Sequence, residues 1–339
     1  MTSSRHPSSR RQFLGQLSGL AALGTVGTSG ILAPSLAWGQ DKWPTRPIRL
    51  VVPYPAGGSS DIIARLISKP LGEALGQPIV VDNRPGANGN IGAAMVAQAG
   101  TENHTLLLCD VGALAITPSV YTKLTFNPDK DLKGVAMLAY SPHLLVVHPS
   151  VPANNLKELV ALSHKQTLNF AVTAIGSAPH LAGVAVQQAT QAAWQYVPYK
   201  GGAQAIADTV GGTAQVLMNG MLATWPQVQA GKLKLLAVSK RTRMALVSQT
   251  PTIAESGVPN FESGTWQGVM APSGMPDALV QRISAELVRI IRTPEIRAQL
   301  AGQGAEVVTM TPSETSKWFS AEEKRWAQVV KSSGVKLDA

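Results

Sequence analysis

Short apolar runs alternate along the chain with segments whose apolar residues recur at helical spacing. The run IRLVV at 48–52 predicts a buried strand, and the pattern from Asp61 to Leu71 predicts a helix with Ser59 or Ser60 as its N-cap. Glycine-rich loops join further pairs of this kind, with strands predicted at 79–81, 106–108, 144–147, 169–172, 214–218 and 233–239. This alternation is typical of parallel α/β units.

Longer helices are predicted in the C-terminal third. From Asp277 to Arg292, apolar residues recur on one helical face. The last helix has Thr311 as its N-cap, Pro312 in the first position and Glu314 in the third, which form a capping box. No repeat and no proline- or glycine-rich linker divides the chain after the N-terminal segment, so we expect α/β lobes joined by several chain crossings. Shorter helices are predicted near 91–99, 156–163 and 222–230.

The N-terminus has the layout of an export signal. The first eleven residues carry three arginines and no acidic residue, and no charged residue occurs over 12–40. The run SRRQFL at 9–14 resembles the twin-arginine signal, and small residues allow cleavage after Ala37 or Gly39. Because glycines dilute the apolar stretch, a cleaved signal over 1–39 is favoured over a permanent membrane anchor.

Charge and composition argue against several classes of function. The 339-residue chain has a net charge of +9, which falls to +6 without the three N-terminal arginines, and no long basic run concentrates it. Nucleic-acid binding is therefore not expected. A single cysteine, Cys109, excludes an intramolecular disulfide and a cysteine-based zinc cluster. The six histidines lack the HxxxH and HExxH spacings of zinc sites, so we expect no metal site.

The common catalytic and nucleotide-binding motifs are missing from the sequence. There is no GxSxG nucleophile elbow, and no motif marks Cys109 as an activated thiolate, although a sequence does not reveal its spatial partners. A buried structural thiol is the favoured interpretation. The run GGSS at 57–60 lacks the lysine of a P-loop, and Gly86, Gly89 and Gly92 do not form GxGxxG, so nucleotide binding is weakly supported.

Four loops bring glycines or small hydroxyl residues to the start of a helix, at 55–61, 83–91, 174–180 and 199–204. Helix N-termini present unpaired N–H groups and a partial positive charge, and in an α/β sheet such loops meet at the carboxyl ends of the strands. Taken singly, each loop is better explained as an ordinary turn between a strand and a helix. Taken together, the four loops predict an anion site.

Four side chains near these loops each have two interpretations. Asp61 either reaches a ligand through water or stabilises its own helix. His180 either donates to a carboxylate or covers a helix start. Tyr54 and Tyr199 either wall a pocket or pack in the core. The sequence leaves all four alternatives open.

Seven ordered segments carry a resemblance to one family. They are PYPAGGSSDIIAR (53–65), VVDNRPGANGNIGA (80–93), GSAPHLAG (176–183), VPYKGGAQAIAD (197–208), AGKLKLLAV (230–238), PTIAESGVP (251–259) and WQGVMAPSGMP (266–276). Together they resemble the substrate-binding receptors of tripartite tricarboxylate transporters, also called Bug-type receptors. The resemblance implies an α/β fold of two Rossmann-like lobes, of periplasmic binding protein type II, with a ligand cleft between them. Lobe 1 would comprise 40–143 and 266–339, and lobe 2 would comprise 144–265.

The resemblance also implies which residues bind the ligand. The matching positions are Tyr54, Ala56, Gly57, Gly58, Asp61, Ser177, His180, Tyr199, Gly201, Gly202 and Ala203. Asp110 and Asn219 are expected to bind the ligand as well. Asn219 stands where relatives commonly carry an acidic residue, and Asp110 lies beside Cys109 in a stretch that varies with the ligand. An amide at 219 removes an ion-pair partner for an amino group, which disfavours amino-acid ligands. The resemblance implies no catalytic residue, no metal and no cofactor.

The function expected from this resemblance is that of a monomeric periplasmic receptor. It would bind a small organic carboxylate by hinge closure and deliver it to the membrane subunits of a tripartite tricarboxylate transporter. Two alternatives stay open, an orphan receptor that informs a sensor and an enzyme that acts on a carboxylate. The sequence offers no nucleophile-base motif for the enzyme.

Overall fold

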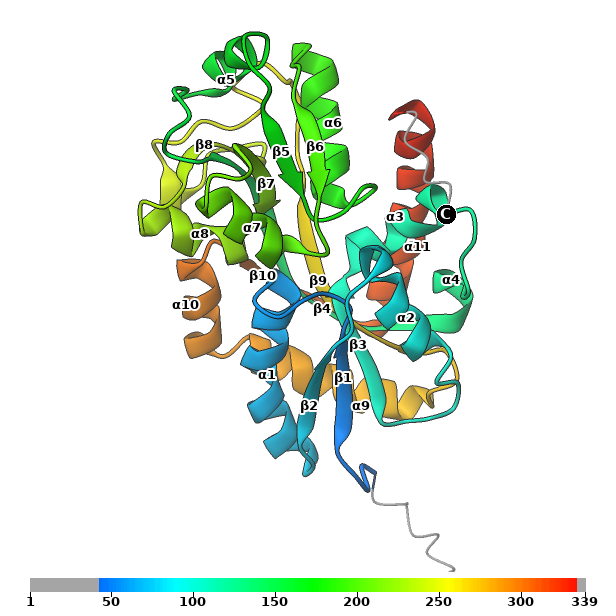
Figure 1. Cartoon of the computed structure of the whole chain (residues 1–339). Helices are drawn as coiled ribbons and strands as arrows, with labels where there is room; N and C mark the ends of the chain where they lie inside the picture. The colour runs from blue at the N-terminus through cyan, green and yellow to red at the C-terminus, as the bar shows by residue number, and fades with distance from the viewer. Residues whose placement is uncertain (1–42, 334–339) are drawn as a thin grey trace, which may run out of the picture. The chain divides into compact units, whose positions relative to one another are not determined.

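Ten strands and the helices between them form residues 43–333, the part of the chain that the computed structural model describes (Figure 1). The predicted export signal lies outside the described residues. The first elements are β1 (Ile48–Val52), α1 (Ser59–Leu75), β2 (Ile79–Asn83), η1 (Ala87–Gly89), α2 (Asn90–Ala97), β3 (Thr105–Asp110), α3 (Val111–Val120), α4 (Pro128–Asp131) and β4 (Leu132–Val147).

The chain continues with α5 (Leu156–Ser163), β5 (Asn169–Val172), α6 (Ala178–Thr190), β6 (Gln195–Pro198), α7 (Gly202–Val210), β7 (Val216–Gly220), α8 (Met221–Gln229), β8 (Lys234–Val238) and η2 (Ala245–Val247). The last elements are β9 (Gly264–Pro272), α9 (Asp277–Ile291), α10 (Pro294–Gly302), β10 (Glu306–Met310) and α11 (Pro312–Ser333). Among the described residues, no helix combines the length and the apolar character that a membrane span requires.

The strands form one mixed sheet in the order β2-β1-β3-β9-β4-β7-β5-β6, with β8 and β10 also paired to β4. β1 is parallel to β2 and β3, and β5 is parallel to β6 and β7, as the alternating pattern predicts. The prediction of an α/β fold is confirmed. The sequence pattern did not reveal that β4 and β9 are antiparallel to each other at the centre of the sheet. Its strand at 144–147 is only the end of β4, whose earlier residues include a glycine, a lysine and a proline.

β4 connects two sets of strands, which we name the first strand group (β1, β2, β3, β9 and β10) and the second strand group (β5, β6, β7 and β8). Its residues Leu132–Pro142 pair with β9, and His143–Val147 pair with β7. The predicted lobe boundaries, 143/144 and 265/266, therefore fall inside β4 and β9. The chain crosses between the strand groups within continuous strands, and the division into two lobes stays a prediction.

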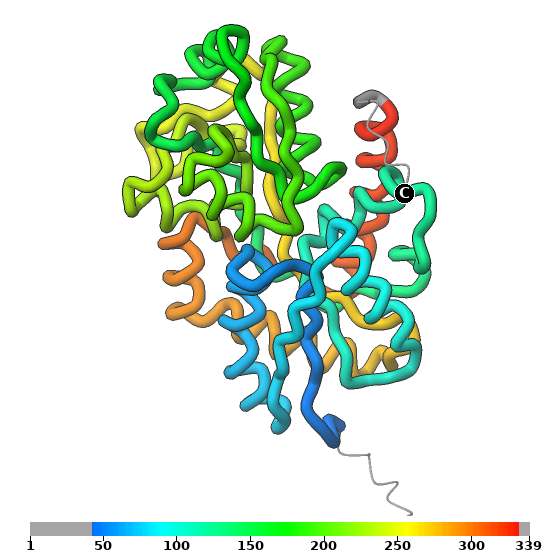
Figure 2. Tube along the Cα trace, in the orientation of Figure 1, coloured from blue at the N-terminus to red at the C-terminus, as the bar shows by residue number. Residues whose placement is uncertain are grey.

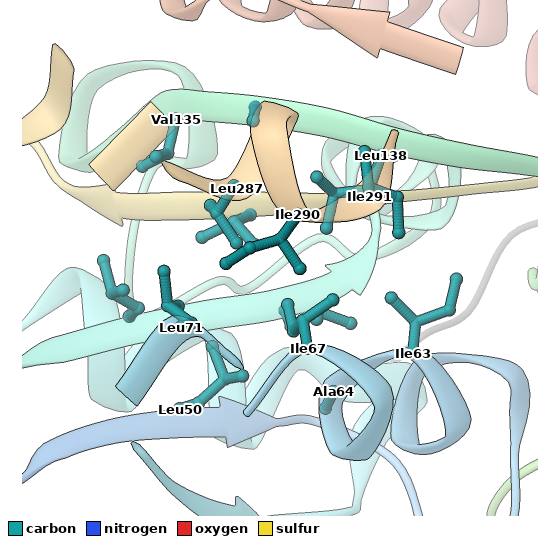
Figure 3. Close-up of a cluster of buried hydrophobic side chains, with 14 of the residues drawn as sticks. Leu50, Ile63, Ala64, Ile67, Leu71, Val135, Leu138, Leu287, Ile290 and Ile291 are labelled. Carbon is teal, nitrogen blue, oxygen red and sulfur yellow. The ribbon is translucent and has the colours of Figure 1, made fainter. Parts of the chain in front are cut away.

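The largest hydrophobic core lies between α1, α9 and the first strand group. Ile67 and Leu71 of α1 pack with Leu287 and Ile290 of α9 and with Leu50 of β1, and all five are buried (Figure 3). Burial of each such side chain contributes about 1.5–3 kcal/mol. The blue α1 and the orange α9 lie side by side in Figure 2 although more than half of the chain separates them. The C-terminal third therefore completes the fold of the N-terminal part.

The second strand group has its own core, centred on aromatic side chains. The ring centroid of Phe170 lies 5.1 Å from that of Trp194 and 5.3 Å from that of Tyr196, and both ring pairs are tilted. A smaller buried cluster joins elements next to both strand groups, with Ile116 of α3, Leu181 of α6 and Val330 of α11 among its members. This cluster, which we name the α3/α6/α11 cluster, holds α6 against α3 and α11.

The ends of two helices test the predicted caps. α1 begins at Ser59 rather than Asp61, and Gly58 is its N-cap in place of the predicted Ser59 or Ser60. The capping box of α11 is confirmed. The N–H of Thr311 donates to Oε2 of Glu314 at 2.8 Å, and the N–H of Glu314 donates to Oγ1 of Thr311 at 3.3 Å.

Candidate functional site

Helix N-termini that follow strands of both strand groups meet at a cavity of ≈ 50 Å³. Its lining is mostly small and polar. It comprises Tyr54, Gly58, Ser59, Ser60, Asn88, Asp110, Ala113, Thr173, Ser177, Ala178, Pro179, Gly202, Asn219, Thr265 and Gln267. Among these described lining residues there is no lysine, arginine or histidine. A single water needs about 10–15 Å³ in this kind of measure, so the cavity fits a small solute.

α1 and α7 reach the cavity with N-termini that no side chain caps. Their N-caps are Gly58 and Gly201, and in the described structure neither helix has a capping hydrogen bond from a side chain. The two loops touch, because a Cβ at Gly201 would lie 2.4 Å from Cδ of Pro55. First-turn N–H groups have no partner within their own helix, so the two helix starts together offer donors and partial positive charge to an anion. We name this region the uncapped end of the cavity.

α3 and α6 reach the cavity with N-termini that their own residues cap, and we name this region the capped end. Oδ1 of Asp110 accepts hydrogen bonds from the N–H groups of Gly112 and Trp266, both at 3.0 Å. Oγ of Ser177 accepts from the N–H of His180 at 3.4 Å, and its hydroxyl donates to the carbonyl of Ala174 at 2.7 Å. Part of the donor capacity at the capped end is therefore already used.

Asp110 adds an acidic group to the capped end. Its side chain is only 6% exposed. Burial raises the pKa of this carboxyl to about 6, against the opposing effect of hydrogen bonds from Trp266, Ala113 and Gly112, and the charge of Glu322 raises it further. The lining therefore combines one buried acid with uncharged donors.

Asp61 supports the loop in front of α1. Its Oδ2 accepts from the N–H of Gly57 and from Nε of Arg65, both at 2.9 Å, and its Oδ1 accepts from Nδ2 of Asn83 at 3.0 Å. Burial alone would raise the pKa of this carboxyl, but the hydrogen bonds from Arg65, Gly57 and Asn83 outweigh it and hold the pKa below 3.8. These contacts favour the interpretation that Asp61 stabilises its own helix start and loop over the interpretation that it reaches a ligand through water.

The side chain of His180 makes its polar contact within its own loop. Its Nδ1 accepts from the N–H of Gly176 at 3.1 Å, and its ring meets the ring of Tyr196 edge-on at 4.8 Å. Burial lowers the pKa of the imidazole to about 4, so the ring is neutral at pH 7. The contacts therefore favour the interpretation that His180 covers a helix start.

The structure brings together six of the thirteen residues predicted to bind ligand. They line the cavity: Tyr54, Gly58, Asp110, Ser177, Gly202 and Asn219. The other seven do not line it: Ala56, Gly57, Asp61, His180, Tyr199, Gly201 and Ala203. Several of these build the wall from behind, since Gly57 packs on Ala203 and Gly201 on Pro55. Tyr199 lines a neighbouring hollow of ≈ 230 Å³.

Sequence reasoning missed several polar lining residues. Thr265 and Gln267 lie on β9, which the pattern did not predict as a strand, and the hydroxyl of Ser60 donates to Oε1 of Gln267 at 2.7 Å across 207 positions. Thr173 directly follows the strand predicted at 169–172 and was detectable by its position. Asn88 lies in the predicted loop 83–91, where the asparagine-glycine pair was the available signal.

No metal site is evident in the described part of the chain, because no group of three or more His, Cys, Asp or Glu residues there could hold an ion. Cys109 is buried, and burial followed by the charge of Asp110 raises the pKa of its thiol well above 9. A thiol of this kind is protonated at pH 7. Its environment fits the interpretation of a structural thiol.

Comparison with known proteins identifies relatives along nearly the whole chain. Protein BugT of Bordetella pertussis is 35% identical over 322 residues, which cover 94% of this chain and 98% of BugT. The structure of R. palustris Rpa4515 with adipate is 34% identical with a TM-score of 0.83, over 86% of this chain and 98% of that one. The structure of the periplasmic binding protein BugD is 30% identical with a TM-score of 0.82, and the match covers 87% of this chain and 99% of BugD.

A family model gives the same result over a defined range. Residues 63–335 match the tripartite tricarboxylate transporter family receptor, TctC. This range includes most of the helices and strands that surround the cavity. The resemblance stated from the sequence is confirmed, and the chain belongs to the TctC family of tripartite tricarboxylate transporter receptors.

Proposed function

We propose that the mature protein is a periplasmic receptor that binds a small organic carboxylate in this cavity. The observation that carries the proposal is the uncapped end, where α1 and α7 meet without side-chain caps. A carboxylate accepts several N–H hydrogen bonds and is stabilised by the partial positive charge of a helix start. The adipate bound to the relative Rpa4515 supports this class of ligand.

In this proposal the ligand carboxylate accepts hydrogen bonds from first-turn amides of α1 and α7. Neighbouring hydroxyl groups add further donors. Oγ of Ser59 and Oγ1 of Thr265 lie 3.0 and 3.2 Å from the position of a Cβ at Gly220, so they lie close to each other. Asn219 lies beside Gly202, and its Nδ2 donates to Oγ1 of Thr224 at 3.3 Å. Because the described lining residues include no arginine or lysine, recognition of charge falls to backbone and hydroxyl donors.

The proposed receptor is not an enzyme. No histidine is among the described lining residues, so the lining hydroxyls have no imidazole base beside them. His180 does not line the cavity, and its Nδ1 accepts a hydrogen bond from the N–H of Gly176. Incubation with adipate followed by ¹H NMR should leave the adipate spectrum unchanged over hours. Conversion of adipate would overturn this part of the proposal.

Closure and delivery complete the proposed role. Ligand bound between the two strand groups would stabilise a closed form, to which the α3/α6/α11 cluster contributes apolar contact. The monomer would then present the ligand to the membrane subunits of a tripartite tricarboxylate transporter. Export by the twin-arginine route and cleavage after Ala37 or Gly39 would deliver it to the periplasm. An intact mass with residue 1 retained in periplasmic protein would contradict this route.

Thermal unfolding with adipate and its diamide, adipamide, tests the proposal. Adipate at 100 times its dissociation constant should stabilise the fold by about 2.7 kcal/mol, which raises Tm. Adipamide has the same length and shape but no negative charge, so it should leave Tm unchanged. Equal shifts with the two compounds would contradict anion capture by backbone amides. The same pair of measurements with succinate and succinamide extends the test to a shorter chain.

A further inference from the structure

A second and larger hollow adjoins the capped end of the cavity. Its volume is ≈ 380 Å³, and Ala178 lines both spaces. Sites for small organic molecules commonly enclose about 300–1,000 Å³. The described lining of the cavity has no lysine or arginine, whereas this hollow is lined by two arginines and two glutamates: Arg241, Arg325, Glu262 and Glu322. We name it the charged hollow.

The strands that cross between the strand groups form part of the wall of the charged hollow. Tyr140 of β4 and Gly264 of β9 both line it. The two strands approach closely there, since a Cβ at Gly264 would lie 2.5 Å from Cε2 of Tyr140. A molecule in the charged hollow would therefore contact the segments about which the strand groups would move relative to each other.

The two charged walls of this hollow come from different parts of the fold. α11, which packs on α3 and β4, contributes Glu322, Arg325 and Trp326. Their spacing of three and four residues places them on one face of the helix. The segment between β8 and β9 contributes Arg241 and Glu262. The walls therefore face each other across a space that depends on how the two strand groups are placed.

Each wall forms an ion pair of its own. Nε of Arg241 donates to Oε2 of Glu262 at 2.8 Å, and Nε of Arg325 donates to Oε1 of Glu322 at 2.9 Å. In the described part of the chain, no ion pair joins one wall to the other. The side chains of Arg241 and Arg325 are 70% and 55% exposed, and ion pairs of this kind contribute about 0–1 kcal/mol. An occupant can therefore replace these pairs at little cost.

Aromatic side chains supply the apolar part of the lining. Trp266 and Trp326 both line the charged hollow. The ring centroid of Trp266 lies 4.7 Å from that of Tyr140, and Cζ of Arg325 lies 4.7 Å from the ring centroid of Trp326. Indole rings accept both apolar groups and cations. The charged hollow thus combines both signs of charge with an apolar surface.

We propose that the charged hollow is a second binding site, which takes an amino acid with an apolar side chain. The carboxylate of the amino acid pairs with Arg241, its ammonium group pairs with Glu322 on the opposite wall, and its side chain packs on the indole rings. Glu322 is the favoured partner of the ammonium group because its side chain is 17% exposed, against 41% for Glu262, so solvent screens its charge less. A compound with only one of the two charges leaves one wall unmatched.

The charged hollow is connected to the cavity through Asp110. This residue lines the cavity, and its Oδ1 accepts hydrogen bonds from the N–H groups of Gly112 and Trp266, which both line the charged hollow. An amino acid that pairs with both walls stabilises the placement of the strand groups seen here, in which the loops at Pro55 and Gly201 also touch. Its binding therefore tightens the binding of a carboxylate in the cavity. Only this coupling rests on the proposed function.

Isothermal titration with matched compounds tests the second site. L-Phenylalanine carries both charges, 3-phenylpropanoate lacks the ammonium group and 2-phenylethylamine lacks the carboxylate. L-Phenylalanine should bind at least about 10-fold more tightly than either, and Arg241→Gln and Glu322→Gln should each weaken it by about 10-fold or more. L-Leucine, 4-methylpentanoate and 3-methylbutylamine form a second series. The titrations are made in the wild type and in Gly58→Asp, whose new carboxylate should exclude anions from the cavity and leave the charged hollow unchanged.

Two ion pairs elsewhere in the chain provide matched controls. Glu286 and Arg289 form a pair on α9 with the same three-residue spacing as Glu322 and Arg325. Arg243 pairs with Glu255 in the segment between β8 and β9. None of these four residues lines the charged hollow, so Glu286→Gln and Arg243→Gln should leave the affinity for L-phenylalanine within about 2-fold.

Several outcomes would overturn the second site. They are the absence of binding for both amino acids, equal affinity for L-phenylalanine and 3-phenylpropanoate in Gly58→Asp, and a loss in Glu286→Gln as large as in Glu322→Gln. Binding of L-phenylalanine that is lost in Gly58→Asp but kept in Glu322→Gln would assign the amino acid to the cavity and would also overturn it.

Titration of adipate tests the coupling. Saturating L-phenylalanine should raise the affinity of the wild type for adipate by about 5-fold or more and should leave that of Glu322→Gln unchanged. An unchanged or lowered affinity of the wild type would overturn the coupling. Binding of L-phenylalanine without binding of any carboxylate would support the second site and contradict the proposed function, so the two failures are distinguishable.

Discussion

The two ends of the cavity are built from the same motif, a strand followed by a loop and a helix start. They differ in whether a side chain of the protein accepts hydrogen bonds from the first-turn N–H groups. At the uncapped end, Gly58 and Gly201 precede α1 and α7 and supply no side-chain acceptor. At the capped end, Asp110 and Ser177 accept from their own helices. Glycine is a weaker N-cap than aspartate by only a few tenths of a kcal/mol. The chain thus keeps one pair of helix starts open at little cost in stability.

Conversion of the uncapped end into a capped one should have the largest effect. Gly58→Asp places a carboxylate at the start of α1, where φ −80° suits an N-cap and a Cβ would lie 3.6 Å from the nearest atom. The new carboxylate should take the amides and repel a ligand anion, so adipate affinity should fall at least about 1,000-fold, or about 4 kcal/mol. Isothermal titration measures this, and unchanged urea unfolding is the control for folding. Binding of adipate by Gly58→Asp at wild-type affinity would contradict the claim that the uncapped end binds the ligand carboxylate.

The acid of the capped end should produce the next largest effect, on stability against pH. The pKa of Asp110 is about 6 in the folded protein against an ordinary 3.8, so between these values the folded state binds the proton that the unfolded state has lost. The free energy of unfolding should therefore fall by about 3 kcal/mol relative to a protein without this acid as pH rises from about 4 to 6. Asn at 110 keeps an acceptor for Gly112 and Trp266 but does not titrate. The lowered pKa of buried His180 acts in the opposite direction in both proteins, so the test is the difference between them. Urea unfolding from pH 4 to pH 7 should show wild-type stability falling relative to Asp110→Asn, and parallel profiles of the two proteins would contradict it.

Removal of the support behind the uncapped end should have a smaller effect. Asp61→Ala leaves the N–H of Gly57, the side chain of Asn83 and the guanidinium of Arg65 without this acceptor, and should cost about 2 kcal/mol of stability. The pKa of Asp61 lies below its ordinary value, so its contribution is present above about pH 4 and is lost as pH falls through the lowered pKa. Urea unfolding at pH 7 and pH 3 should show a larger difference between the two proteins at pH 7. An equal difference at both values would mean that the carboxylate charge is not involved.

Loss of a cap at the capped end should have the smallest effect. Ser177→Ala removes the acceptor for the N–H of His180 and the donor to Ala174, and should lower stability by about 1 kcal/mol. Adipate affinity should fall far less than in Gly58→Asp, because the α6 amides are not the proposed anion donors. A loss of adipate affinity as large as that of Gly58→Asp would assign the anion to the capped end.

Much of the fold was visible in local patterns. The strands at 48–52 and 169–172 and the helix at 156–163 have the predicted bounds, because their apolar periodicity is regular. β9 and the first part of β4 were missed. They form the antiparallel centre of the sheet, and their glycines, polar residues and prolines interrupt the alternation that marks a strand.

The candidate site was visible only in part, for a physical reason. The glycine loops lie close to their helices in sequence, so their position follows from local rules. The pairing of Ser60 with Gln267 and the left-handed backbone of Asn88 depend on tertiary packing. The contrast between Gly58 and Gly201 on one side and Asp110 on the other was present in the sequence. The sequence did not show that these helix starts line the same cavity, so the contrast could be interpreted only from the structure.

Amide chemical shifts measured by ¹H–¹⁵N NMR during titration with adipate test the central claim most directly. The account predicts that the N–H groups of Ser59, Ser60 and Ala203, in the first turns of α1 and α7, move strongly downfield as they donate to the carboxylate. Those of Gly112 and Ala113 at the start of α3 should move little, because Asp110 already occupies them. Large shifts confined to Gly112 and Ala113, with the α1 and α7 amides unmoved, would contradict the account.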